Sequence, residues 1–146
     1  MLKYEKIFDN FDLKKFETSV LSGKGHDWNA AYECCDRWVN SNKTALNWIS
    51  SKGKLEQLSY RDLEVKSKNF ANILIKKGIK SGDVVAGLLP RIPELLVVIV
   101  GTWRIGAVYQ PLFTAFGPKA IEIRISKQTG SNAKIILTDP VNKSKL

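Results

Sequence analysis

The first part of the chain places apolar residues at helical spacing before it changes to an alternating pattern. Between positions 27 and 40, apolar side chains recur on one helical face, and Asp27 is a suitable cap for that helix. Cys35 lies on the apolar face, whereas Cys34 lies about 100° away from it. We therefore predict that Cys35 is a small core residue rather than half of a reactive dithiol.

A β-hairpin and a long helix are predicted next. β-Branched and aromatic residues over 44–49 indicate a strand, and the segment 55–58 returns as its partner after a turn that contains glycine. Ser59 and Asp62 have the spacing of a capping box, which begins a helix that ends at Gly78. One face of this helix carries Leu63, Ser67, Phe70, Ala71 and Leu74.

From residue 84 onward, short apolar runs alternate with helical segments. We expect strands over 84–89, 108–112 and 134–138, and helices over 93–105 and 118–128 that begin at prolines. This order predicts an α/β fold with a mostly parallel sheet and flanking helices, because parallel strands need helical crossovers.

The same pattern divides the chain into two parts. Residues 1–43 form a helical lead-in, whose first 26 residues are polar, partly helical and end in a loop around Gly23 and Gly25. Residues 44–146 form the α/β unit, which opens with the hairpin. The total of 146 residues leaves room for one compact domain or part of a larger one.

The charge is strongly positive, with 23 basic against 14 acidic residues and a net charge of +9. Most of the bases are lysines scattered along the chain, whereas base readout favours arginine forks and phosphate grooves favour clustered charge. We therefore expect no nucleic-acid partner and take the charge as a term in solubility and steering.

Cysteine and histidine are too few for a metal site or a disulfide framework. Cys34 and Cys35 are adjacent, and His26 is the single histidine, which we expect in a loop beside Gly25. Reduced thiols favour a cytoplasmic location. The longest clean apolar run, 95–103, is well short of the ~20 residues that a membrane helix needs, so we expect no membrane contact.

No common catalytic motif is present. The chain contains no GxxxxGK[ST], no GxGxxG after a strand, no GxSxG and no HExxH. Acids at strand ends, such as Asp83 and Asp139, are explained by turns and caps. Composition and periodicity therefore predict an α/β unit without naming a reaction.

Several strings in a fixed order are more informative. The strings are SYRDL at 59–63, GDVV at 82–85, PRIPE at 90–94, GAV at 106–108 and PLFTAFG at 111–117. In order and spacing they resemble the amino-terminal part of the AMP-forming acyl-CoA synthetases, within the adenylate-forming superfamily. The helical segment 29–38 also resembles the one that precedes the first strand of acetyl-CoA synthetases, so the resemblance covers about 28–146.

The resemblance implies a ligase of two steps that uses ATP, coenzyme A and magnesium. A carboxylate, such as acetate or another short-chain acid, attacks the α-phosphate of ATP to give acyl-AMP and pyrophosphate. The thiol of coenzyme A then displaces AMP. The glycine-rich Ser/Thr loop and the lysine that this family uses lie after the matched region, so the resemblance implies an amino-terminal fragment with no catalytic residues and no activity alone.

One family site falls inside the matched region. The resemblance implies that Phe113, Thr114 and Ala115 line the pocket for the adenine end of coenzyme A. An arginine that contacts the phosphates of coenzyme A in the family corresponds to Lys143, where lysine replaces the planar fork. Phe113 as a plain core residue is the alternative interpretation.

Two further expectations concern the chain by itself. An incomplete sheet leaves apolar surface and unpaired backbone, so the fragment should associate with itself or use the lead-in helix as cover. The alternative to the ligase fragment is a stand-alone α/β binding or interaction module without catalysis.

Overall fold

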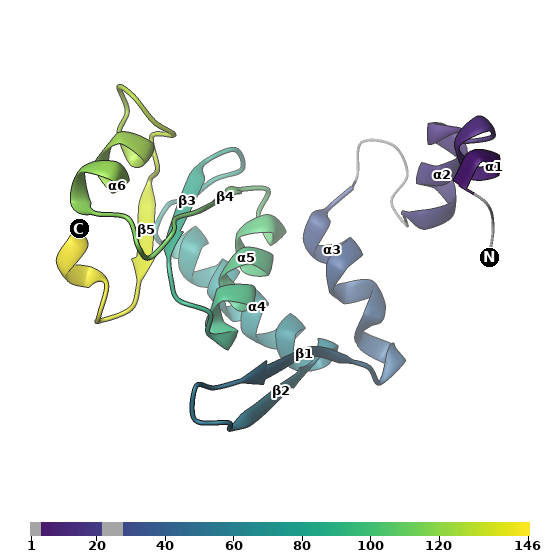
Figure 1. Cartoon of the computed structure of the whole chain (residues 1–146), viewed down its shortest axis with the longest axis horizontal. Helices are drawn as coiled ribbons and strands as arrows, with labels where there is room; N and C mark the ends of the chain where they lie inside the picture. Colours follow the sequence, from purple (N-terminus) through teal and green to yellow (C-terminus); the bar gives the residue numbers. More distant parts are fainter. Residues whose placement is uncertain (1–3, 22–27) are drawn as a thin grey trace.

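A computed structural model describes residues 4–21 and 28–146 of the chain. The expected loop at Gly23 and Gly25, His26 and the expected cap Asp27 lie outside the described residues. The lead-in contains two short helices, α1 (Tyr4–Asp9) and α2 (Leu13–Val20), and α2 is capped by Asp12. In Figure 1 these helices stand at the end of the molecule farthest from the sheet.

The helix expected over 27–40 is two shorter elements, which corrects the sequence-based prediction. Asn29 caps α3 (Ala30–Cys34) by accepting hydrogen bonds from the amides of Ala31 and Tyr32. Cys35 then leaves helical geometry with φ −132° and ψ −66°, and the chain continues as the 3₁₀ helix η1 (Asp36–Ser41). At the start of this 3₁₀ helix, the Asp36 carboxylate accepts hydrogen bonds from the guanidinium of Arg104.

The hairpin and the long helix agree with the prediction. Strands β1 (Thr44–Ile49) and β2 (Leu55–Ser59) pair in antiparallel register, with Gly53 in the turn at φ +79°. Helix α4 (Tyr60–Lys76) begins with the capping box of Ser59 and Asp62 and is followed by Gly78 at φ +81°. The left-handed conformation of Gly78 explains why glycine ends this helix.

The remaining elements form the predicted parallel sheet. Strands β3 (Val84–Leu88), β4 (Val108–Pro111) and β5 (Ile135–Thr138) lie in the order β4-β3-β5, and both pairings are parallel. Helix α5 (Pro93–Arg104) joins β3 to β4, and α6 (Pro118–Ile125) joins β4 to β5. The 3₁₀ helix η2 (Lys143–Lys145) follows β5.

Helix α6 is shorter than expected, because Ser126 already has extended backbone at ψ 158°. The Ser126 carbonyl accepts from the amides of Gly130 and Asn132, so the chain reverses there instead of completing another turn. The prediction of a helix to residue 128 is therefore wrong at its end.

The sheet lies between two helical layers, with α6 on one side and α4 and α5 on the other (Figure 1). Val85 belongs to the cluster that α4 completes through Leu74, whereas Ala86 and Leu88 pack with Ile121 of α6. A third cluster joins Ala31 and Cys35 of the lead-in to Leu63 and Val100, so α3 covers α4 and α5 rather than the sheet. No helix in the described part of the chain is long and apolar enough to span a membrane.

Candidate functional site

The carboxyl ends of β3, β4 and β5 lie at one edge of the parallel sheet, where open α/β sheets bind their ligands. Three loops follow these strands, over 89–92, 112–117 and 139–146. The second loop carries the predicted Phe113–Ala115 segment, and the third carries Lys143. The fold therefore brings the two predicted parts of the site to the same edge.

The loop after β4 has an anchored base and an exposed aromatic residue. The Leu112 amide donates to the Gly87 carbonyl at 2.9 Å, and the Phe116 amide donates to the Phe113 carbonyl at 2.9 Å. The Phe113 side chain is 62% exposed and meets Phe116 edge to face at 5.8 Å between ring centroids. An exposed aromatic face on an ordered turn is suited to stacking on a planar ring such as adenine. Phe113 is therefore not a plain core residue.

Phe116 also takes part in a cation–π contact. The guanidinium of Arg124 on α6 lies 4.2 Å from the centroid of the Phe116 ring. The same arginine donates to the Ala120 carbonyl at 2.8 Å within α6. The ring on which Phe113 rests is thus fixed to the helix that follows the loop.

Lys145 joins the third loop to the second, a contact that the sequence analysis missed. Its ammonium donates to the Thr114 carbonyl and to Asn142 Oδ1, the latter at 3.0 Å. Asn142 is only 7% exposed, and Asp139 Oδ1 accepts from its backbone amide at 3.0 Å and its side-chain amide at 2.7 Å. The regular spacing of Asp139, Asn142 and Lys145 at three-residue steps was the available signal.

Lys143, the residue predicted to meet phosphate, is exposed on the first position of η2. Within the described residues its ammonium makes no hydrogen bond or ion pair, so its charge faces solvent near the same edge. Its role toward coenzyme A stays a prediction.

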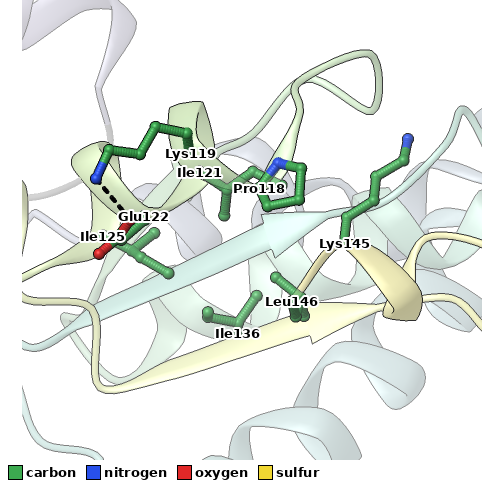
Figure 2. A pocket seen from close by; sticks show the side chains of 8 residues that line it. All are labelled: Pro118, Lys119, Ile121, Glu122, Ile125, Ile136, Lys145 and Leu146. Atoms are coloured by element: carbon green, nitrogen blue, oxygen red, sulfur yellow. Dashed lines mark hydrogen bonds and ion pairs between the residues drawn. The ribbon is translucent and has the colours of Figure 1, made fainter.

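A groove of about 490 Å³ runs between α6 and the end of the chain. Figure 2 shows Pro118, Ile121 and Ile125 above it, Ile136 and Leu146 below it, and the ion pair of Lys119 with Glu122 at one end. Because β5 is an edge strand, this groove opens beside unpaired backbone. Most of the groove surface is apolar, and the groove lies next to the candidate site.

The loop after β3 is held by the hairpin. The indole N–H of Trp48 on β1 donates to the Arg91 carbonyl at 2.7 Å. A small apolar cleft of about 230 Å³ lies at this junction and is lined by Leu46, Trp48, Arg91, Ile92, Leu95, Leu96 and Ile99. The hairpin therefore fixes the PRIPE string at the sheet edge.

Two acidic side chains next to strands are used in turns rather than in a metal site. Among residues 4–21 and 28–146, no three His, Cys, Asp or Glu side chains gather into a possible metal site. Asp83 and Asp139 are used in turns, where they accept from the Lys80 amide and from Asn142.

Comparison with known proteins identifies the family. Residues 35–146 match the sequence model of the AMP-binding enzymes. The chain belongs to this family. The strand order and pairing confirm the expected α/β fold with a parallel sheet. The relatives described next confirm the resemblance to the AMP-forming acyl-CoA synthetases.

The chain is similar to several bacterial acetyl-coenzyme A synthetases. The chain is 36% identical over 132 residues to the acetyl-coenzyme A synthetase of Escherichia coli O157:H7. This match covers 88% of the chain and 19% of that protein. It is 37% identical over 116 residues to the acetyl-coenzyme A synthetase of Chlorobaculum tepidum, covering 77% of this chain and 17% of that protein.

A solved structure shows the same fold. The crystal structure of a Brucella canis acyl-CoA synthetase superposes on this chain with a TM-score of 0.92 and 47% sequence identity. The match covers 99% of this chain and 26% of the Brucella canis chain. The chain thus spans about a fifth of the length of the curated relatives that it matches.

Proposed function

We propose that this chain supplies part of an ATP-dependent, AMP-forming acyl-CoA synthetase that acts on acetate or another short-chain acid. The carboxylate oxygen attacks the α-phosphate of ATP, pyrophosphate leaves, and acyl-AMP forms with magnesium offsetting the phosphate charge. The thiol of coenzyme A then attacks the acyl carbon, loses its proton and releases AMP. The observation that carries this proposal is the 47% identity over 99% of the chain to an acyl-CoA synthetase structure.

The part of the reaction that this chain serves is the binding of coenzyme A. Phe113, Thr114 and Ala115 are proposed to meet its adenine end, because Phe113 exposes an aromatic face at the carboxyl edge of the sheet. Lys143 is proposed to meet its phosphates as a single charge at the same edge. ATP and the acid are assigned to parts of the family's fold outside the matched region.

It follows that the 146-residue chain does not form acyl-AMP on its own. The chain lacks the glycine-rich phosphate loop of the family, and no metal cluster lies among the residues that the structure describes. The two free thiols, Cys34 and Cys35, support a cytoplasmic protein.

A chimaera tests the proposal. Residues of the Escherichia coli acetyl-coenzyme A synthetase that match this chain are replaced by the chain, and acetate-dependent exchange of pyrophosphate into ATP is measured. We expect pyrophosphate exchange from the chimaera and none from the chain alone. The chimaera should also form the thioester with coenzyme A, and Phe113→Ala should raise its KM for coenzyme A. A folded chimaera without exchange would overturn the proposal and favour the module without catalysis.

We also propose that the chain alone associates with a second copy of itself. β4 and β5 are both edge strands, and apolar groups are exposed along this part of the fold, including Val108 and Leu146. In the part of the chain that the structure describes, the lead-in packs on α4 and α5, and no further strand pairs with the outer edge of β4 or β5. Light scattering should give a mass above that of one chain, and a strict monomer over a wide concentration range would contradict this.

A further inference from the structure

The contact between Lys145 and Thr114 links two loops that are 31 residues apart in sequence. It is part of a chain of hydrogen bonds that begins at Asp139, passes through Asn142 and ends on the Thr114 carbonyl. Asn142 is buried within this chain, and Lys145 is half-buried. The groups are therefore partly shielded from water, which strengthens each bond.

The geometry separates the two lysines of η2. A lysine ammonium has three donors, and Lys145 uses two of them on the carbonyl oxygens of Thr114 and Asn142. An ammonium held in this way is poorly placed to reach a phosphate as well. Lys143, two residues earlier, is exposed, and its ammonium has no such partners within the described residues.

Thr114 is the middle residue of the segment that carries the exposed Phe113. The two ends of the turn are anchored by the backbone bonds of Leu112 and Phe116, so the Thr114 carbonyl is the point at which a neighbouring loop fixes its tip. Fixing the tip before a ligand arrives lowers the ordering cost of binding.

We propose that Lys145 is a positioning residue, which holds the Thr114 carbonyl and thereby keeps Phe113–Ala115 in the conformation that receives the adenine end of coenzyme A. The role in coenzyme A binding rests on the proposed function. The fixing of the loop does not, because it concerns contacts within this chain.

Hydrogen exchange in the 146-residue chain tests the fixing of the loop. In Lys145→Met, the Phe116 amide should exchange about 10-fold faster, the order expected for loss of one charged hydrogen bond. The matched variant Lys143→Met removes the same charge two residues away and should leave this amide unchanged. Lys145→Arg, which can still donate to both carbonyls, should restore slow exchange. Unchanged exchange in a folded Lys145→Met chain would overturn the proposal.

Kinetics of the chimaera test the consequence for coenzyme A. Lys145→Met should raise KM for coenzyme A several-fold with little change in kcat, and the rise should persist at high ionic strength because it reflects loop order. The rise caused by Lys143→Met should shrink at high ionic strength, because screening weakens a phosphate contact. A salt-sensitive rise for Lys145→Met would show a ligand contact and overturn the positioning role. If exchange accelerates but KM stays constant, the loop contact stands and the proposed coenzyme A site fails.

Discussion

Arg104 in the last turn of α5 forms a two-pronged ion pair with Asp36 at the start of η1. The two guanidinium nitrogens lie 2.7 and 2.5 Å from the two carboxylate oxygens, and the side chains are only 10% and 20% exposed. Arg104 Nε also donates to Ser67 Oγ on α4 at 2.9 Å. One guanidinium therefore joins the lead-in to both helices that cover the sheet.

Loss of this pair should destabilise the fold far more than loss of a surface pair. Arg104→Met leaves the Asp36 carboxylate half-buried without its partner, and we expect a loss of about 3 kcal/mol in the free energy of unfolding. The control is Glu122→Gln, which removes the exposed pair with Lys119 and should cost below about 1 kcal/mol. Urea unfolding measures both, and equal effects would contradict a structural role for Arg104.

The same pair predicts a dependence of stability on pH. Burial alone raises the pKa of Asp36, but the hydrogen bonds and charge of Arg104 outweigh it and hold that pKa below its usual value. A depressed folded pKa gives stability that is present above the unfolded pKa, about 3.9, and is lost as pH falls through the folded pKa. Asp36→Asn should therefore lose stability at neutral pH and show a flatter decline below about pH 4 than the unaltered chain. Parallel acid unfolding curves for the two proteins would refute this assignment.

The elements that local chemistry determines were predicted from the sequence. The capping box of Ser59 and Asp62 and the left-handed Gly78 set the ends of α4 by neighbouring residues alone. The sequence-based prediction missed the break of the helix at Cys35. At this break Asp36 pairs with Arg104, which lies 68 residues away in the sequence. No local pattern reports such a partner.

The candidate site divides in the same way. The PLFTAFG string indicated the loop that exposes Phe113, and this resemblance depended only on residue order. The partner of Thr114 depends on the 3₁₀ turn of η2, which moves the ammonium of Lys145, rather than Lys143, onto that loop. The sequence resemblance pointed to Lys143 for the phosphates of coenzyme A, which stays a prediction, and it gave no sign of the contact between Lys145 and Thr114.

The two adjacent cysteines should differ sharply in reactivity. Cys34 is exposed, whereas Cys35 is fully buried, and burial together with the charge of Asp36 raises the pKa of the Cys35 thiol to about 11. Because the thiolate is the nucleophile, an alkylating reagent near neutral pH should modify Cys34 and spare Cys35 until the chain unfolds. Mass spectrometry of the labelled chain gives the count, with Cys34→Ser as the control. Rapid labelling of Cys34→Ser in native conditions would show that Cys35 is not a core residue.

Tyr109 on β4 lies over Gly87 on β3 so closely that no side chain fits there. A Cβ at position 87 would come 2.3 Å from the Tyr109 hydroxyl and 2.8 Å from its ring. The hydroxyl oxygen is buried and has no hydrogen-bond partner among the described residues, and burial raises the pKa of this phenol. The ring of Tyr109 therefore fills the space beside Gly87, but its buried hydroxyl lacks a hydrogen bond, which lowers the stability of the fold.

Substitutions at these two positions should have opposite effects. Tyr109→Phe keeps the ring and removes the unpaired hydroxyl, so we expect a gain of about 1 kcal/mol in the free energy of unfolding. Gly87→Ala forces the ring aside and should cost about 2 kcal/mol. In a Tyr109→Ala background, where the ring is absent, the same Gly87→Ala change should cost little, and urea unfolding of the four proteins of this cycle measures the coupling. If Gly87→Ala costs the same in both backgrounds, its effect comes from the strand backbone rather than from the tyrosine, and the close packing of these two residues is not what makes glycine necessary here.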